Sequence, residues 1–167
     1  MRTRFVYPTV IRDSYMKFST DDYNILSYFL KKYYMSYDQV ITWAYAQYSD
    51  QGIDPFIEKV SLASDIAEII ELISNSYQVY GEPSKEFLAG EAAKEYSEGK
   101  LSLYTVINRI LHNLDLELPE NERQELYIAE DYFGWHDLAE SKAIVHAMPL
   151  FDKYRPVYED AVAKFCV

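Results

Sequence analysis

The chain has 167 residues, of which 49% are apolar and 26% charged, and this composition is typical of a folded globular domain and excludes a largely disordered one. Its one cysteine, Cys166, excludes an intramolecular disulfide and a cysteine-based zinc site. The formal net charge of −11 repels phosphate and therefore argues against direct nucleic-acid binding.

The first predicted element is an irregular or extended arm over residues 1–19. Residues 5–11 are mostly β-branched or aromatic and surround Pro8, a pattern typical of an extended segment or a short edge strand. Arg12 then interrupts the segment before an apolar run as long as a signal-peptide core can form. Because no stretch approaches the roughly 18 apolar residues of a membrane span, we expect a cytoplasmic protein folded as one domain over residues 1–167.

Helical patterns follow the arm in chain order. Apolar residues recur at i, i+3, i+4 and i+7, the spacing of one helix face, most regularly over 36–50, 65–79 and 102–114. Prolines suited to a first helical turn and glycines suited to a helix end mark further boundaries. The predicted helices cover residues 20–34, 36–50, 54–63, 65–79, 83–98, 102–114, 119–133, 136–147 and 156–165.

Capping residues independently support these helix starts. An oxygen-bearing side chain stands at the start of five predicted helices, where it can accept a hydrogen bond from a first-turn amide: Thr20, Ser36, Asp54, Ser64 and Ser102. Pro156 suits the first position of the last helix, since the N–H that proline lacks has no partner there.

The apolar faces of these helices predict the core. The most regular faces bury seven aliphatic residues: Ile69, Ile70, Ile73, Val106, Ile107, Ile110 and Leu111. Three tyrosines share apolar faces and are predicted to lie in the core as well: Tyr45, Tyr48 and Tyr77.

The connections between the predicted helices are short, about two to six residues, so consecutive helices are expected to pack as antiparallel neighbours. The predicted fold class is therefore all-α, a compact multi-helix bundle or an orthogonal helical array of about eight or nine helices.

Acidic residues and aromatic residues together suggest a protein-binding surface. Residues 115–131 contain seven carboxylates and one basic residue, Arg123. Such a concentration of negative charge speeds encounter with a basic protein, although it also suits a surface that serves only solubility. Tyrosine and tryptophan, which interleave with these acids, are enriched at interfaces. The predicted partner-binding residues are Asp115, Glu117, Glu120, Glu122, Glu125, Tyr127, Glu130, Asp131, Tyr132 and Trp135.

The best enzyme-like group is Glu130, Asp131, His136 and Glu140, because His136 and Glu140 stand four residues apart and would share a helix face. That spacing is also ordinary on a helix surface, and the H-E-x-x-H pattern of zinc hydrolases is absent. The glycine-rich phosphate-binding motifs and the GxSxG nucleophile motif are absent too. We therefore expect a protein that is not an enzyme and that holds no cofactor and no metal.

The chain resembles bacterial immunity proteins of polymorphic toxin systems, which are small, acidic, tyrosine-rich helical proteins that mask a cognate toxin domain. The resemblance lies in the middle half of the chain, in the Trp43-Ala44 pair and the run S-L-A-S-D-I-A-E-I-I-E-L-I that ends at Ile73. It carries over no functional position and implies binding without chemistry.

The expected function is accordingly an acidic helical protein-binding module, an immunity or inhibitor protein that masks a basic partner such as a toxin domain. Three alternatives stay open. One is a DNA mimic that inhibits a DNA-binding enzyme, one is a helical enzyme or metal-binding domain that uses the group around His136, and one is an adaptor that forms a homodimer through its tyrosine-rich surface.

Overall fold

The computed structural model describes residues 18–135 and 137–166, and the regular elements within them are all helical, which confirms the all-α fold class. In chain order they are α1 (Thr20–Lys31), α2 (Tyr37–Ala46), α3 (Pro55–Ser61), α4 (Ile66–Tyr77), α5 (Lys85–Ser97), α6 (Leu103–Asn108), the π-helical turn η1 (Arg109–Asn113), α7 (Glu120–Trp135) and α8 (Ala139–Ala163).

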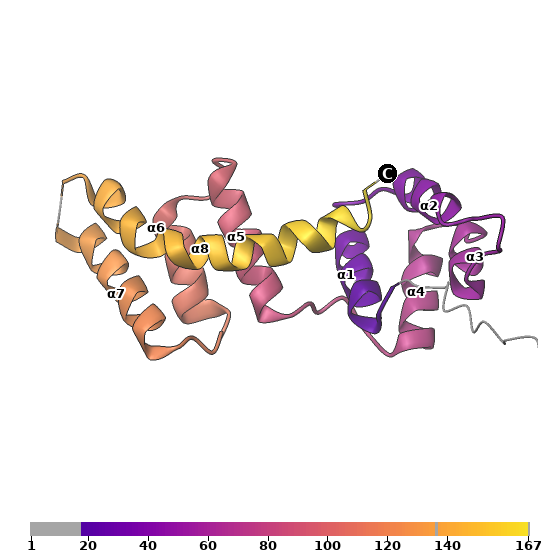
Figure 1. The fold of residues 1–167 in the computed structure, drawn as a ribbon, viewed down its shortest axis with the longest axis horizontal. Coiled ribbons are helices and arrows are strands. Elements are labelled where there is room, and N and C mark those ends of the chain that lie inside the picture. The colour runs from indigo at the N-terminus through magenta and orange to yellow at the C-terminus, as the bar shows by residue number, and fades with distance from the viewer. Residues whose placement is uncertain (1–17, 136, 167) are drawn as a thin grey trace, which may run out of the picture.

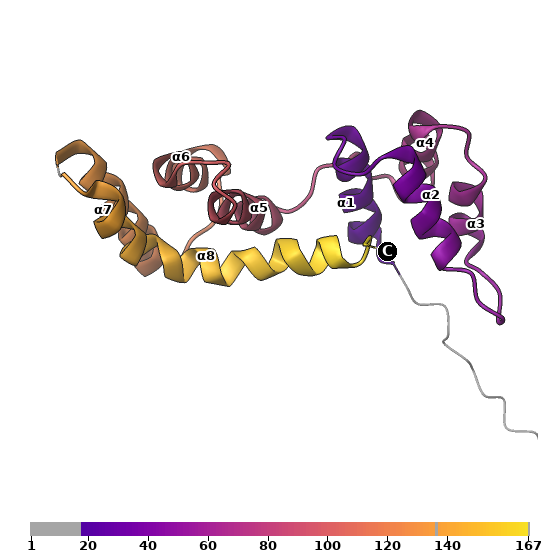
Figure 2. The same cartoon turned by 90° about the horizontal axis from the view of Figure 1, so that it is seen from above.

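The helices form two groups that α8 joins lengthwise (Figure 1). Helices α1 to α4 gather at one end of the molecule, and α5 to α7 gather at the other. Figure 2 shows α8 running along one side of α5 and reaching α1 with its C-terminal end. Helices α5 and α7 both pack extensively on α8, and Ala161 near the end of α8 packs into the core of α1–α4.

Each group has its own hydrophobic core. The core of α1–α4 is rich in aromatic rings, with Trp43 and Tyr23 almost fully buried, and it includes Phe165 from just beyond α8. The other core combines branched aliphatic side chains with alanines of α5, α7 and α8. Small side chains let helices approach closely, and Gly90 of α5 consequently lies against the backbone of Tyr154 of α8.

Five of the seven predicted aliphatic core residues are fully buried: Ile69, Ile73, Val106, Ile107 and Ile110. The other two, Ile70 and Leu111, are only partly buried and pack at the edges of the two cores.

The predicted burial of Tyr45 and Tyr48 is wrong. Both rings are exposed and stack on each other with centroids 5.6 Å apart. Helix α2 instead buries the face that carries Val40 and Trp43, and it ends at Ala46, before Tyr48. Tyr77 does pack against the core, half-buried and stacked on Tyr23.

The C-terminal end of α8 is fastened to the first group by two polar contacts. Lys164 Nζ forms an ion pair with Asp22 Oδ1 at 2.7 Å, and the Trp43 indole N–H donates to the carbonyl of Lys164 at 3.1 Å. Asp22 is itself buried, and it completes a capping box with Ser19 at the start of α1. One carboxylate thus stabilises both a helix start and the contact between distant parts of the chain.

The predicted division of the last region into helices 136–147 and 156–165 is wrong, because α8 continues through Pro149 and Pro156. The two prolines are seven residues apart and share one helix face, and both are exposed. Water can therefore hydrogen-bond to the carbonyls that the missing N–H groups leave without partners. The opposite face, which includes Leu150 and Phe151, is buried against α5 and α7 and holds the helix together.

Two predicted caps are displaced by one residue. The side chain that accepts the first-turn N–H of α1 belongs to Ser19 and not to Thr20, and that of α4 belongs to Asp65 and not to Ser64. Ser36, Asp54 and Ser102 cap their helices as predicted.

The extended segment predicted at residues 5–11 lies outside the described residues. In the part of the chain that the structure describes, no helix is both long enough and apolar enough to span a bilayer.

Candidate partner-binding surfaces

The seven carboxylates of residues 115–131 lie in the loop before α7 and on α7 itself, at the end of the molecule opposite α1–α4 (Figure 1). Five of them are exposed: Asp115, Glu117, Glu120, Glu125 and Asp131. Glu122 and Glu130 are half-buried where α7 meets its neighbours.

Four of these carboxylates have a basic partner within the chain. Glu122 binds Lys153 of α8 at 2.8 Å, and Glu125 contacts His146 Nδ1 of α8 at 2.6 Å. Glu130 contacts His112 Nε2 of η1 at 2.9 Å, and Asp115 binds Lys85 of α5 at 3.2 Å. The first three contacts hold α7 on its neighbours, and the fourth holds the loop before α7 on α5. In the described residues, only Glu117, Glu120 and Asp131 of this segment lack a basic partner. Lysines compensate the charges of Asp115 and Glu122, whereas a histidine compensates a carboxylate only when it is protonated.

The aromatic residues predicted for this surface differ in position. Tyr127 is exposed, with its ring near that of His112. Tyr132 is half-buried and stacked on His146, and Lys142 lies over its ring. The side chain of Trp135 lies outside the described part of the structure. Tyr127 is therefore the one aromatic residue of the predicted set that is described as freely accessible.

The residues of the enzyme-like group are engaged separately where the structure describes them. Glu130 contacts His112, and Glu140 accepts a hydrogen bond from the Tyr96 hydroxyl at 3.2 Å. His136 lies outside the described residues. Within residues 18–135 and 137–166, no three side chains of His, Cys, Asp or Glu lie close enough together to hold a metal ion.

The turn that follows α1 presents an unusual residue, Tyr33. Its amide N–H bonds to Leu30 O, and the next amide, of Tyr34, bonds to Phe29 O, which is the helix-ending arrangement that favours glycine at the first of these positions. Tyr33 has φ of 58°, in the left-handed region, and the residue is 85% exposed. A bulky residue at such a position costs about 1 kcal/mol or more relative to glycine. No packing of the ring offsets that cost, which suggests that the ring serves recognition.

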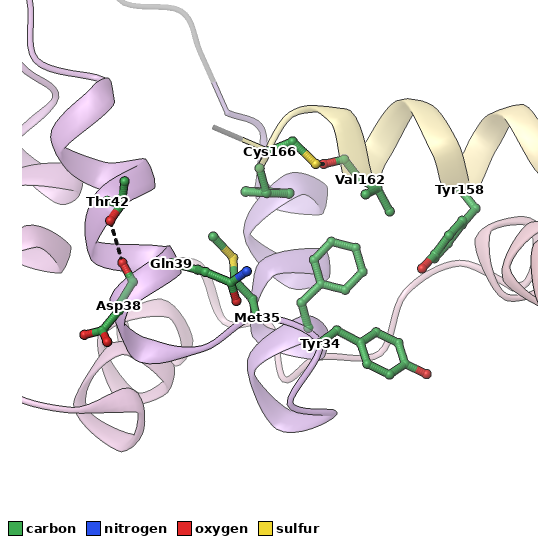
Figure 3. A pocket seen from close by; sticks show the side chains of 10 residues that line it. Tyr34, Met35, Asp38, Gln39, Thr42, Tyr158, Val162 and Cys166 are labelled. Atoms are coloured by element: carbon green, nitrogen blue, oxygen red, sulfur yellow. Dashed lines mark hydrogen bonds between the residues drawn. The ribbon is translucent and has the colours of Figure 1, made fainter.

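An apolar groove of about 410 Å³ lies beside this turn, where α1, α2 and α8 meet (Figure 3). Tyr34 and Met35 line it from the turn, and Tyr158 and Val162 line it from α8. Asp38 stands at the start of α2 on its border, with no basic partner among the described residues. The groove thus combines an apolar floor with a negative rim.

On the other side of Tyr34 lies a second cavity, of about 340 Å³, around Glu91 of α5. Glu91 is only 5% exposed, and its Oε2 accepts a hydrogen bond of 2.7 Å from the Tyr28 hydroxyl, while its Oε1 is buried without a hydrogen-bond partner. Burial raises the pKa of Glu91, an effect that hydrogen bonding to Tyr28 and Tyr34 and the nearby charge of Arg109 only partly offset. Burial and the nearby Glu91 charge likewise raise the pKa of Tyr34 and bring that of Tyr158 to about 12.

Sequence reasoning missed both the Tyr33 position and Glu91. The signal for Glu91 is a lone carboxylate inside the short run A-G-E-A-A at residues 89–93, where the small neighbours predict burial. No glycine follows α1 in the sequence, so nothing there marks the residue that adopts the left-handed backbone conformation. The position of Tyr33 could therefore not be predicted.

Comparison with protein-family models, with curated proteins and with solved structures gives no match.

Proposed function

We propose that the protein is an acidic helical binding module that masks a basic protein partner, such as the toxin domain that an immunity protein neutralises. The observation that carries this proposal is Tyr33, a fully presented aromatic ring held in a backbone conformation that favours glycine. The turn stands between two cavities, and Tyr34 lines both of them. Exposed tyrosine beside concave surface is the composition of a protein-binding hot spot.

The charge of the surrounding helices supports a basic partner. Residues 18–84 contain ten acidic residues and three basic ones. Of those acids, Asp22 alone forms an ion pair within the described part of the chain. The first helical group therefore presents carboxylates that are not compensated internally, and they attract a positively charged surface to the Tyr33 turn.

The test is capture of the partner from a lysate of the source organism with three immobilised proteins: the wild type, Tyr33→Gly and Tyr104→Ala. Tyr104 is the matched control, because it is an exposed tyrosine on α6, in the other helical group. The proposal expects a basic protein that the wild type and Tyr104→Ala retain and that Tyr33→Gly loses. A partner captured equally by all three proteins would show that the Tyr33 turn is not the binding surface.

A further inference from the structure

The apolar groove between α1, α2 and α8 is open to water in the part of the chain that the structure describes (Figure 3). Its lining includes the buried side chains of Phe29, Met35 and Phe165. Tyr158 and Val162 of α8 line it as well and are half-buried. Apolar surface gathered in a concave site is unfavourable in water and marks a place where another group binds.

The sequence of residues 1–17, which lie outside the described residues, has the composition that such a groove binds. Five residues of positions 5–11 are apolar: Phe5, Val6, Tyr7, Val10 and Ile11. The same 17 residues hold four of the 16 basic residues of the chain and one of its 27 acidic residues. Apolar and basic side chains together complement an apolar groove with the uncompensated Asp38 on its border.

The first described residue, Phe18, joins this arm to the fold beside the groove. The Phe18 ring meets that of Trp43 with centroids 5.0 Å apart and stacks on that of Phe165 with centroids 5.8 Å apart. Phe165 also lines the groove. Residues 12–17 alone separate Phe18 from the apolar run, and six residues reach at most about 20–22 Å. Tethering over so short a length gives an effective concentration in the millimolar range, so a weak intrinsic affinity is enough for docking.

We propose that residues 1–17 fold back as an internal ligand, with the apolar run 5–11 in the groove and the basic side chains of the arm towards Asp38. A second copy or a separate peptide of the same intrinsic affinity needs a millimolar concentration to compete with a tethered segment. The docked arm shields the apolar surface next to the Tyr33 turn from other proteins. This assignment rests on the groove and the arm and does not depend on the proposed function.

The test compares the full chain with an arm variant that keeps its length and charge but loses four apolar side chains: Phe5→Ser, Val6→Ser, Val10→Ser and Ile11→Ser. The backbone amide NMR shifts of the groove residues Gln39, Thr42 and Val162 should differ between the two proteins, because the arm of the variant leaves the groove. The amide shifts of Tyr104 and Tyr127, in the other helical group, should be the same in both. Groove shifts that are identical in the two proteins would overturn the proposal.

Two further variants make the comparison specific. Thr3→Ser with Thr9→Ser alters the same arm without removing a large apolar side chain, and its groove shifts should match those of the wild type. Replacing Arg2, Arg4 and Arg12 with Gln should move the Val162 amide signal part of the way towards its position in the serine variant at low salt, since the attraction to the acidic border is weakened. A wild-type position of that signal would overturn the assignment of the basic side chains to the border.

Cys166 gives a second readout, because the one cysteine of the chain is exposed and lines the groove. Iodoacetamide, which is small and uncharged, should alkylate Cys166 at least about threefold faster in the serine variant than in the wild type, as expected when a tethered ligand is mostly bound. Dilution of the wild type should leave its rate unchanged. Equal rates in the two proteins, or protection that grows with protein concentration and so comes from a second copy, would overturn the proposal.

Discussion

Gly90 of α5 and Tyr154 of α8 meet at the backbone: a Cβ added to Gly90 would stand 2.2 Å from the carbonyl oxygen of Tyr154. That oxygen belongs to a helix backbone and cannot turn away as a side chain would. Gly90→Ala should therefore force α5 and α8 apart and lower the free energy of unfolding by about 1–3 kcal/mol or more, measured by urea titration.

The control for this substitution is Gly134→Ala in α7. Nothing lies within 4 Å of the added methyl group there, and alanine favours a helix more than glycine does. This variant should be as stable as the wild type or up to about 1 kcal/mol more stable. Equal free energies of unfolding for the two variants would mean that the close approach of α5 to α8 is absent in solution.

Ile107 is fully buried in the core that α5, α7 and α8 share, and its substitution tests how well that core is packed. Ile107→Ala should cost about 2–5 kcal/mol, because the removed methylene and methyl groups leave a cavity among packed side chains. Leu62, which is 72% exposed, provides the comparison, and Leu62→Ala should change the free energy of unfolding by no more than about 0.5 kcal/mol. A cost below about 1 kcal/mol for Ile107→Ala would indicate that this face meets solvent.

Periodicity and capping predicted the helices well where a single local signal dominated. Ser36 and Ser102 mark starts followed by regular apolar faces, and the structure has a helix at both places. Periodicity failed where tertiary packing overrides a local preference. Pro156 favours a break, yet the buried opposite face of α8 keeps the helix continuous across it.

The candidate sites were harder to predict, because they depend on distances that no spacing encodes. The pairing of Glu125 with His146 joins residues of two different helices, and it turns an apparently free carboxylate into a structural one. The contact of Tyr28 with Glu91 spans 63 residues of sequence. Charge density along the chain shows where acids occur, but only the fold shows which of them are compensated.

The ion pair between the buried Asp22 carboxylate and the half-exposed Lys164 predicts a loss of stability in acid. Burial alone would raise the pKa of Asp22, but its hydrogen bonds to Lys164 and Ser19 outweigh that effect, and the pKa is lowered below its ordinary value of 3.8. A lowered folded pKa adds stability above the unfolded pKa, and this stability disappears as the pH falls through the folded value. Asp22→Asn should thus be less stable than the wild type at neutral pH, with the difference shrinking below about pH 4. A difference that does not depend on pH would contradict the ion pair.

Glu91 predicts the opposite dependence, because burial raises its pKa above the ordinary value of 4.5. The folded state then holds a proton that the unfolded state has already lost, so Glu91 lowers stability as the pH rises from about 4 toward its folded pKa. The free energy of unfolding of Glu91→Gln minus that of the wild type should increase over the same range, as followed by urea unfolding at several pH values. A constant difference would mean that Glu91 is well solvated.

Tyr33→Gly tests whether the Tyr33 ring contributes to the stability of the fold. Glycine adopts φ of 58° without strain, so the variant should keep its stability or gain up to about 1 kcal/mol, measured by thermal or urea unfolding. If the Tyr33 ring contributed only to the fold, its removal would lower the free energy of unfolding. Marked destabilisation would show that the ring packs in solution and would remove the reason to assign it to recognition.

The last prediction concerns the rate at which the partner binds. Glu117, Glu120 and Asp131 are exposed, have no basic partner in the described residues, and lie on α7 and in the loop before it, outside the Tyr33 turn. Charges that do not touch the partner act through the long-range field, which reaches about 30 Å at 10 mM salt but only a few ångströms near 0.5 M. Replacing them together with Gln, Gln and Asn should slow association about tenfold at low salt, leave dissociation unchanged, and have no effect at high salt.

Two controls make this kinetic prediction specific. Tyr33→Gly should act mainly on dissociation, since a packed aromatic anchor sets the lifetime of a complex more than its rate of formation. Replacing Glu122, Glu125 and Glu130 with Gln removes the same formal charge but also frees Lys153, His146 and His112 from their contacts. That variant should loosen α7 and lower the free energy of unfolding, which the triple variant at 117, 120 and 131 should not do. If the latter associates at the wild-type rate in 10 mM salt, the acidic segment serves solubility and takes no part in attracting the partner.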